Sequence, residues 1–278
     1  MRLDRSRADA IVGRALEEDL GSGDLTSNAI FPKTLRVQAS IVAKEQGVLA
    51  GLPVAEMVFH KLDAELGWTP KKQDGETIKA GEVVAELEAD VRTVLAGERV
   101  ALNFLQRLSG IATAAARLAA AVRGLPVRVL DTRKTAPGLR LLDKYAVRVG
   151  GARNHRFGLY DGILIKENHI RAAGGLHEAV SSARQHVPPG LKIEVEASNL
   201  KEVEEALEEK AEIILLDNMS VQEIREALRL IAGRAEVEAS GGVTLENVRE
   251  IALTGVGLIS VGALTHSVKA LDLSLEVQ

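Results

Sequence analysis

The sequence predicts an α/β protein with an α+β domain first and a domain built on a parallel sheet second. Two observations carry this prediction. From about residue 127 onward, short runs rich in β-branched residues alternate with helical patterns, whereas the first 125 residues mix helices with alternating segments. The chain has 278 residues, of which 46% are hydrophobic and 27% charged, so it can bury one large core or two smaller ones.

Six runs in the second part have the length and composition of strands. Strands separated by helices require right-handed crossovers and so predict a parallel sheet, either doubly wound or curved into a barrel. Six strands are too few for a complete (β/α)₈ barrel. Capping signals mark three helix starts, at Asn199, Ser220 and Thr244. The six runs are 127–131, 162–166, 192–197, 212–217, 235–240 and 257–262.

The first part opens with an amphipathic helix near 8–18, and the segment 35–51 suggests a strand that ends in glycines. A short helix is expected over 52–61. The segment 74–91 alternates like a β-hairpin that turns at Lys79–Gly81. A lysine in a glycine-bounded turn also occurs in biotinyl and lipoyl carrier modules, but their flanking pattern is absent. Residues 91–123 predict a long helix with a break near Ser109–Gly110.

Composition excludes several classes of protein. With no cysteine and only six histidines, the chain has no thiolate nucleophile and no cysteine-ligated zinc, so any metal should be held by oxygen atoms. Aromatic residues make up 3% of the chain, too few for the stacking platforms of single-stranded nucleic-acid binders. No apolar run has the length of a membrane helix, and the N-terminal charges are not followed by a signal-peptide core. We therefore expect a cytoplasmic protein that binds neither membranes nor nucleic acid.

The segment from Asp131 to Arg171 holds nine Lys and Arg against four Asp and Glu, although the chain as a whole is at −4. A positive site in an acidic protein attracts small anions and repels polyanions. A solvated basic helix face is the alternative, and it accounts for Arg140, Lys144 and Arg148. It does not account for the cations at strand ends, so we expect an anionic ligand there.

Polar residues follow the carboxyl end of nearly every predicted strand, and in parallel α/β folds these ends converge on the face that holds the active site. The glycine turns SGG and VGA after the last two strands could hold phosphate through backbone N–H groups. Glu196 and Asp217 could ligate Mg²⁺ through water, bind sugar hydroxyls or stabilise developing positive charge, or they could simply pair with a nearby cation. The strand-end residues are Asp131, Thr132, Arg133, Lys134, Lys166, Glu167, Asn168, Glu196, Asp217, Asn218, Ser240, Gly241, Gly242, Val261, Gly262 and Ala263.

The chain resembles the quinolinate phosphoribosyltransferases over nearly its whole length. The resemblance rests on EDLGSGDLTS at 18–27, GERVALNFLQRLSGIAT at 97–113, the segment 131–170, LLDN at 215–218, SGG, and VGALTHS at 261–267. It implies an N-terminal α/β sandwich over 1–112 and an incomplete α/β barrel of about six strands over 113–278, with a C-terminal tail that could return to the first domain. The implied reaction converts quinolinate and 5-phosphoribosyl 1-diphosphate to nicotinate mononucleotide, diphosphate and CO₂, with Mg²⁺.

The resemblance also implies roles for single residues. Quinolinate is received by Arg133, His155 and Arg156, with Thr132 and Lys166 nearby. Lys134 and Lys166 also serve the phosphoribosyl donor, Glu196 and Asp217 its ribose hydroxyls and the metal, and the turns Ser240–Gly242 and Val261–Ala263 its 5-phosphate. The implied catalytic residues are thus Lys134, Lys166, Glu196 and Asp217. Arg99 is expected to reach the site from the partner subunit of a homodimer with shared active sites, which could assemble further.

Three other functions stay open from the sequence. A phosphosugar aldolase would use Lys166 as a Schiff-base lysine beside the same phosphate turns. A related nicotinate phosphoribosyltransferase would accept an acceptor with one carboxylate, whereas the set of Arg99, Arg133, His155 and Arg156 favours two. A non-catalytic anion sensor would keep the cations but would not need Glu196 and Asp217.

Overall fold

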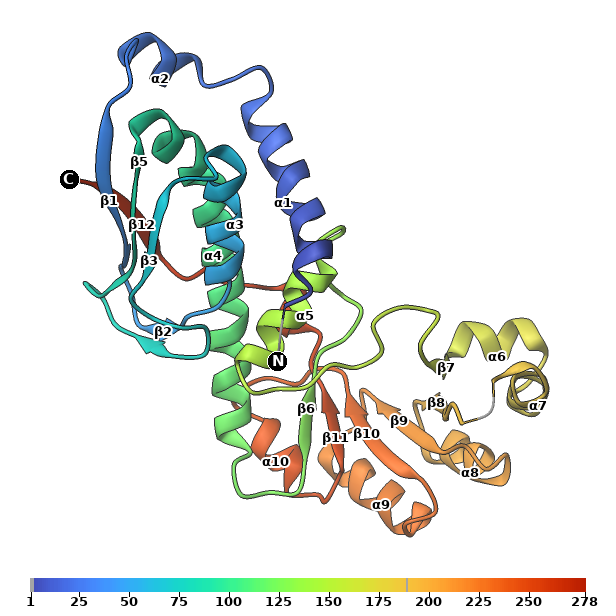
Figure 1. Cartoon of the computed structure of the whole chain (residues 1–278). Helices are drawn as coiled ribbons and strands as arrows, with labels where there is room; N and C mark the ends of the chain where they lie inside the picture. Colours follow the sequence, from blue (N-terminus) through green and yellow to red (C-terminus); the bar gives the residue numbers. More distant parts are fainter. Residues whose placement is uncertain (1–2, 189) are drawn as a thin grey trace. The chain divides into compact units, whose positions relative to one another are not determined.

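The computed structural model describes residues 3–188 and 190–278 (Figure 1). The chain forms two compact units that alternate along the sequence. The first unit contains the residues up to Ala116 together with Thr135–Gly151 and Leu264–Gln278, and the second contains Arg117–Lys134 and Ala152–Ala263. The predicted domain boundary after residue 112 stays a prediction.

The first unit contains a four-stranded antiparallel sheet with the strand order β12-β1-β5-β3. In β5 the apolar Leu87 and Ala89 are buried and alternate with the exposed Glu86 and Glu88, so one face of the sheet packs against the core. β12 brings the C-terminus back to the N-terminal strand β1. The strands are β1 (Arg36–Ala43), β3 (Gly67–Pro70), β5 (Val83–Asp90) and β12 (Leu273–Val277), and a small separate sheet pairs β2 (Gly47–Val48) with β4 (Thr77–Ile78).

Helices complete this unit, and several of them start where the sequence supplies an N-cap. Asp4 caps the first helix and Asp24 caps the second through side-chain oxygens. Asp74 accepts hydrogen bonds from Gly51 and Leu52 at the start of the third. The helices are α1 (Arg5–Leu20), α2 (Leu25–Ile30), α3 (Leu52–Leu62), α4 (Val91–Ala121), whose end enters the second unit, and α5 (Arg140–Val149).

The predicted hairpin over 74–91 is wrong. The turn exists, because Glu82 N donates to Lys79 O and Gly81 has a φ of 85°. The two sides of the turn nevertheless pair with different partners, β4 with β2 and β5 with β1 and β3. Two backbone hydrogen bonds tie the turn to the end of β1: Gly81 N donates to Ala43 O, and Ala43 N donates to Glu82 O. This separates the two strands.

The predicted break near Ser109–Gly110 is also wrong, because α4 runs through it. Gly110 instead permits a close approach, since a Cβ there would overlap the backbone carbonyl of Lys269. Ser109 is fully buried and exchanges hydrogen bonds with the backbone of Ala50. Both small residues therefore allow other segments of the chain to pack closely against α4, and neither bends the helix.

The basic stretch on α5 is not a solvated face. Lys144 is only 2% exposed, although Arg140 and Arg148 are partly exposed. The neighbouring Asp143 is fully buried and accepts two hydrogen bonds from the guanidinium of Arg107, at 2.9 and 2.8 Å. The helix is therefore packed on more than one side. The spacing of four residues between Arg140, Lys144 and Arg148 predicted one solvent-exposed face, and that prediction is wrong for Lys144.

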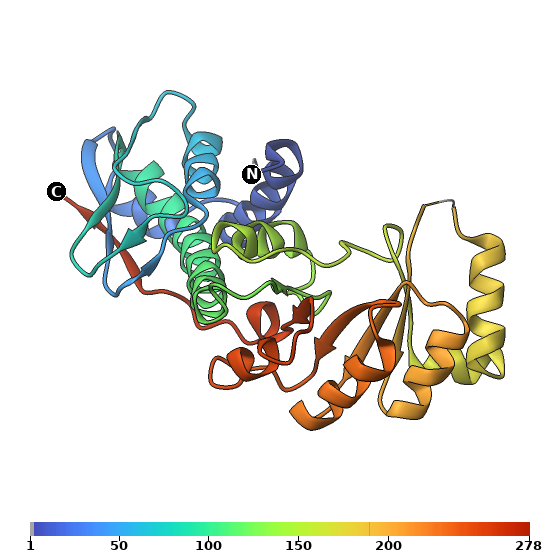
Figure 2. The same cartoon turned by 90° about the horizontal axis from the view of Figure 1, so that it is seen from below.

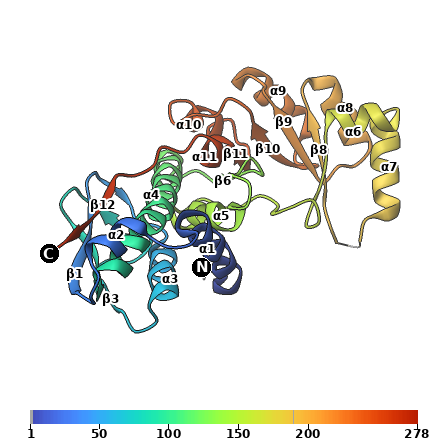
Figure 3. The same cartoon turned by 90° about the horizontal axis from the view of Figure 1, so that it is seen from above.

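The second unit is built on a six-stranded parallel sheet with the order β6-β11-β10-β9-β8-β7. All six predicted strands are present. β6 and β7 lie at opposite edges, so the sheet is open, and α8 and α9 lie along one of its faces (Figures 1 and 3). The strands are β6 (Arg128–Leu130), β7 (Ile163–Ile165), β8 (Ile193–Ala197), β9 (Ile213–Asp217), β10 (Glu236–Ser240) and β11 (Leu258–Ser260).

Crossover helices connect these strands (Figure 2). Asn199 and Ser220 cap their helices as predicted. Thr244 does not, because its own N–H donates to Asn247, which is the N-cap of the next helix. The helices are α6 (Glu167–Ala173), α7 (Leu176–His186), α8 (Leu200–Glu208), α9 (Val221–Ile231), α10 (Val248–Ala252) and α11 (Ala263–His266), which leads back to the first unit. No helix in the described part of the chain has the length and hydropathy needed to cross a membrane.

Strand alternation gives the sheet two different faces. In β8 the buried apolar Ile193, Val195 and Ala197 alternate with Glu194 and Glu196. Because side chains at every second position share a face, both glutamates point away from the apolar side. The same alternation in β9 and β10 puts Asp217 and Glu238 on the face that carries the glutamates.

Candidate active site

A pocket of about 320 Å³ lies within the second unit, at the carboxyl ends of the parallel strands. It collects residues that are far apart in the sequence: three come from the segment after β6, two from the irregular segment with His155 and Arg156, and the others from β7 to β11 or their ends. Cations, carboxylates, hydroxyls and two leucines share its wall. The lining residues are Thr132, Arg133, Lys134, His155, Arg156, Leu164, Lys166, Glu196, Leu215, Asp217, Glu238, Ser240 and Ser260.

The parallel register explains how the carboxylates meet the cations. Ile165 pairs with Val195, so Lys166 follows β7 at the level of Glu196 on β8. These two side chains form an ion pair. Asp217 is aligned with Ser240 on the next strand, which is aligned with Ser260. The sheet therefore aligns polar groups at the carboxyl ends of four adjacent strands, β8 to β11.

His155 and Arg156 come from an irregular segment beside β6. Arg153 forms a parallel bridge with Leu130, and the fully buried Asp131 accepts hydrogen bonds from Asn154 Nδ2 at 2.5 Å and His155 N at 2.8 Å. The conformation of this segment is thus fixed by the Asp131 carboxylate, so this strand-end residue supports the site without lining the pocket. A guanidinium nitrogen of Arg156 donates to Gly162 O at 2.9 Å.

Arg133 and Arg156 both line the pocket. Partial burial, together with the nearby charge of Arg133, lowers the pKa of Arg156 from its ordinary value. Two guanidinium groups that repel each other in a half-enclosed pocket are stabilised by an anion that both can contact. Leu164 and Leu215 add apolar surface to the same pocket, which suits a ligand with a ring and negative substituents.

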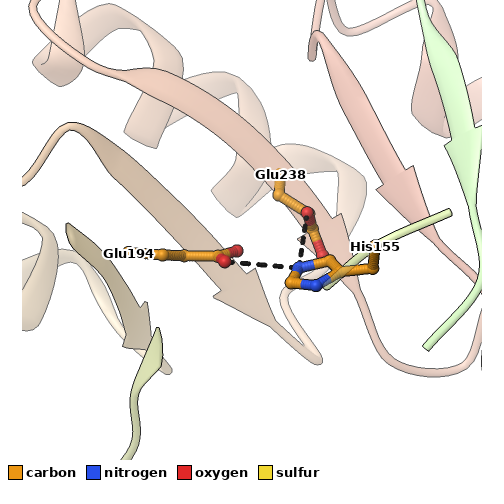
Figure 4. A group of neighbouring side chains, drawn as sticks. All are labelled: His155, Glu194 and Glu238. Carbon is orange, nitrogen blue, oxygen red and sulfur yellow. Dashed lines mark ion pairs between the residues drawn. The ribbon is translucent and has the colours of Figure 1, made fainter. Parts of the chain in front are cut away.

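A buried cluster of His155, Glu194 and Glu238 lies at the same face (Figure 4). Nε2 of His155 is 3.2 Å from Glu194 Oε2 and 3.5 Å from Glu238 Oε2. Burial opposes a charge on the ring, but hydrogen bonds to the two glutamates outweigh it and raise the pKa of His155 to about 10. Burial raises the pKa of Glu194, against the effect of the His155 hydrogen bond.

Glu194 and Glu238 are not among the site residues predicted from the sequence, because they lie inside strands and not at strand ends. A signal was present nonetheless. The strand sequences IEVEA and EVEAS carry glutamate at alternate positions, where buried parallel strands normally carry aliphatic residues. Both glutamates share a face with residues that the prediction did include, Glu196 and Ser240.

The turn after β10 is tight. Gly241 and Gly242 have φ values of 89° and 59°, and a Cβ at Gly241 would overlap Oδ1 of Asn218. Asn218 has a φ of 56°, donates its backbone N–H to Ser240 O, and donates its side-chain amide to Asp217 Oδ2 at 2.8 Å. Asn218 therefore links the carboxylate of Asp217 to the glycine turn.

The predicted phosphate contacts differ in their surroundings. Ser240 lines the pocket, and Gly241 and Gly242 continue from it. The Val261 amide donates to Leu130 O at 2.9 Å inside the sheet, so this N–H already has an acceptor, and its predicted phosphate contact stays a prediction. Gly262 follows Val261, and Ala263 begins α11.

Arg99 is not part of this pocket. It is exposed on α4 in the first unit, among residues whose burial alternates with the helical period. Its predicted contribution from a partner subunit stays a prediction.

Glu196 and Asp217 are suitable ligands for Mg²⁺. Both supply carboxylate oxygens to the pocket and both are partly exposed. Mg²⁺ in proteins is commonly held by one or two carboxylates, with water and substrate phosphates completing its shell. The donor set therefore fits this ion, although Glu196 also pairs with Lys166.

Comparison with known proteins gives consistent matches. The family models for the N-terminal and C-terminal domains of quinolinate phosphoribosyl transferase match residues 24–109 and 111–276. A probable nicotinate-nucleotide pyrophosphorylase (carboxylating) of Bacillus subtilis is 46% identical over 260 residues, covering 94% of this chain and 90% of that protein. The chloroplastic nicotinate-nucleotide pyrophosphorylase (carboxylating) of Arabidopsis thaliana is 44% identical, covering 96% and 82%.

Solved structures match the whole chain. The nicotinate-nucleotide pyrophosphorylase of Francisella tularensis aligns with a TM-score of 0.93 at 40% identity, covering 100% of this chain and 98% of that one. The enzyme of Ehrlichia chaffeensis gives 0.95 at 39%, covering 100% of both. Human nicotinic acid phosphoribosyltransferase gives 0.62 at 14%, which shows a shared fold alone.

Proposed function

The chain belongs to the quinolinate phosphoribosyl transferase family, and we propose that it transfers phosphoribosyl from 5-phosphoribosyl 1-diphosphate to quinolinate in NAD biosynthesis. The products are nicotinate mononucleotide, diphosphate and CO₂. The observation that carries this proposal is the composition of one pocket, in which two arginines and His155 lie beside carboxylates and hydroxyls. One of its lining residues, Ser240, directly precedes the glycine turn Gly241–Gly242. A dianionic ring needs the cationic groups, and a phosphorylated sugar needs the carboxylates, the hydroxyls and the turn.

Quinolinate carries two adjacent carboxylates on a pyridine ring. We assign these carboxylates to Arg133, His155 and Arg156, because guanidinium groups bind carboxylates through two parallel hydrogen bonds. Thr132 and Lys166 contribute further donors. Leu164 and Leu215 supply the apolar surface on which the ring can pack.

The donor occupies the other side of the pocket. Lys134 and Lys166 contact its phosphates, Ser240–Gly242 with Gly262 and Ala263 its 5-phosphate, and Glu196 and Asp217 its ribose hydroxyls. Loss of diphosphate gives the ribose C1 oxocarbenium character, which the two carboxylates stabilise electrostatically. Mg²⁺, held by Glu196 and Asp217 directly or through water, would balance charge on the diphosphate.

The acceptor chemistry follows from the ring. The pyridine nitrogen attacks C1 and forms the N-glycosidic bond as the C1–O bond to diphosphate breaks. The quaternised ring then accepts the electron pair of the C2–carboxylate bond, so the carboxylate leaves as CO₂ and a proton takes its place. Arg133 and Arg156 orient the acceptor for this sequence, and no covalent enzyme intermediate is needed.

We further propose that the working form is a homodimer in the cytoplasm, with Arg99 of each subunit completing the site of the other. Arg99 is exposed on α4, which leaves its guanidinium available to a second chain.

A phosphosugar aldolase is less well supported. Lys166 is ion-paired with Glu196, whereas Schiff-base lysines are desolvated or lie beside another cation. Borohydride trapping with a carbonyl substrate should therefore leave Lys166 unmodified.

The direct experiment incubates the protein with quinolinate, 5-phosphoribosyl 1-diphosphate and Mg²⁺ and identifies the nucleotide by chromatography. Nicotinate replaces quinolinate in a parallel reaction. We expect nicotinate mononucleotide from quinolinate and almost none from nicotinate. A preference for nicotinate would overturn the acceptor assignment, and ligand binding without turnover would favour an anion sensor.

A further inference from the structure

Two glutamates are buried on the face of the parallel sheet that carries Glu196 and Asp217. Each lies two residues before a residue that lines the pocket, Glu194 before Glu196 and Glu238 before Ser240. Glu194 is 5% exposed and Glu238 is 1% exposed. Their neighbours in register are apolar, Leu164 and Ile213 for Glu194, and Leu215 and Leu258 for Glu238. Carboxylates in such surroundings are unfavourable unless they interact with a specific partner.

The partner is His155. The two glutamates come from strands on either side of β9, yet both direct Oε2 to the same ring nitrogen, at 3.2 and 3.5 Å (Figure 4). The other oxygens, Glu194 Oε1 and Glu238 Oε1, are buried without a hydrogen-bond partner within residues 3–188 and 190–278. The glutamates therefore converge on the ring and not on the backbone of their own sheet.

The same three groups have the spacing of a metal site, so a cation must be considered. The hydrogen-bond pattern argues against it. If the ring is neutral, Nδ1 accepts from Arg156 N at 2.8 Å and the hydrogen is on Nε2. If the ring is charged, both nitrogens carry hydrogen and Nδ1 no longer accepts from Arg156 N. In either state Nε2 donates to the carboxylates, whereas a metal would need its lone pair.

The histidine connects this cluster to the proposed acceptor site. His155 lines the pocket, and its neighbour Arg156 follows it directly in the chain and donates its amide to the ring. Asp131 fixes the backbone of this segment through Asn154 Nδ2 and His155 N. Glu194 and Glu238 hold the ring itself, because the Oε2 atoms of both lie close to Nε2.

We propose that Glu194 and Glu238 are positioning residues for the acceptor. Both hold the His155 ring through Nε2, so that His155 and Arg156 have the orientation needed for binding before the dicarboxylate arrives. This inference rests on the proposed function only for the identity of that ligand. The proposal and simple electrostatics predict opposite effects of neutralising Glu238. Glu238 lines a pocket for a dianion, so a carboxylate that acted only through its own charge would repel the ligand, and its neutralisation would strengthen binding. A positioning role predicts weaker binding instead.

Glu238→Gln is the informative variant, because it removes the charge and keeps the size. We expect it to weaken quinolinate binding about tenfold, since a charge-assisted hydrogen bond becomes a neutral one, and to leave the KM of the phosphoribosyl donor within about twofold. Glu236→Gln is the matched control. Glu236 lies on the same strand and face but pairs with Arg128 and Lys192 and does not line the pocket. It should change neither value.

A double-mutant cycle shows whether Glu238 acts through His155. Quinolinate affinity is measured by calorimetry for the wild type, Glu238→Gln, His155→Ala and the double variant. With the ring removed, Glu238→Gln should have less than about a twofold effect. Should Glu238→Gln fail to fold, Glu194→Gln with its own His155→Ala cycle makes the same comparison.

Several results would overturn the inference. Tighter or unchanged quinolinate binding in Glu238→Gln, additive effects with His155→Ala, or equal losses for both substrates with a lower Tm would each do so. Stoichiometric bound metal that disappears in His155→Ala would assign the cluster to a cation instead. A wild-type protein that does not bind quinolinate would refute the proposed function and this inference together. A wild type that binds, with an unaffected Glu238→Gln, would refute the inference alone.

Discussion

Gly241→Ala should damage the proposed 5-phosphate turn through a specific clash. Gly241 has a φ of 89°, and an added Cβ would overlap Asn218 Oδ1 and lie 2.9 Å from Asn218 N. Left-handed backbone costs a residue with a Cβ about 1–2 kcal/mol. Overpacking adds about 1–3 kcal/mol. Gly242→Ala is the matched control, because its φ is 59° and no atom lies within 4 Å of the added Cβ, so it carries only the backbone cost.

The difference between the two variants is thus the overpacking, about 1–3 kcal/mol, which corresponds to roughly 5- to 150-fold in an equilibrium constant. We expect this factor in the donor KM, with thermal unfolding measured alongside to detect any part that appears as lost stability. In an Asn218→Gly background, Gly241→Ala should cost much less than in the wild type, since the overlapping side chain is absent and glycine accepts the φ of 56°. Equal donor KM values and equal Tm values for the two alanine variants would refute the reasoning.

Three further predictions concern the cations. Arg133→Ala should raise the quinolinate KM by the loss of a charge-assisted contact, about 1.5–3 kcal/mol, while the donor KM changes little; steady-state kinetics with each substrate varied would check this, and an unchanged quinolinate KM would remove Arg133 from the acceptor site. His155→Gln should cost more stability at about pH 6 than at about pH 10.5. The folded pKa of His155 is raised from 6.5 to about 10, so its stabilisation is fully present below 6.5 and is lost as pH rises through 10. Denaturant unfolding at the two pH values would measure the difference, and a pH-independent cost would contradict it. Arg99→Ala should lose activity and regain part of it when mixed with Arg133→Ala, because hybrid dimers rebuild one complete site; no recovery after confirmed subunit exchange would exclude a shared site.

The parallel sheet could be predicted from the sequence because its strands are short apolar runs between well-capped helices. Asn199 and Ser220 hydrogen-bond within three residues of themselves, so their role is readable locally. The hairpin around Lys79–Gly81 was predicted from equally local signals and was wrong, since its strands pair with β1, β2 and β3 instead. Alternation predicts a strand but does not identify its partner.

Part of the pocket could be predicted from places after strands, because a parallel sheet gathers the carboxyl ends of its strands on one side; these residues are Thr132, Arg133, Lys134, Lys166, Glu196, Asp217 and Ser240. The roles of His155 and Arg156 came from the family resemblance, and Leu164, Leu215 and Ser260 were not predicted. Glu194 and Glu238 were missed because they lie inside strands and interact with a histidine that is distant along the chain. Similarly, Gly110 resembled a helix breaker, and only its contact with Lys269 explains it. The contact between Gly110 and Lys269 leaves no periodic signal in a single sequence, whereas the glutamates at alternate positions of β8 and β10 do.

The most direct test of the proposed chemistry follows CO₂ from quinolinate labelled with carbon isotope in the 2-carboxylate. We expect one equivalent of labelled CO₂ for each diphosphate released, and neither product when quinolinate or 5-phosphoribosyl 1-diphosphate is omitted. Labelled CO₂ formed without the donor, or diphosphate released with the label retained in the nucleotide, would contradict a single pocket that joins glycosyl transfer to decarboxylation.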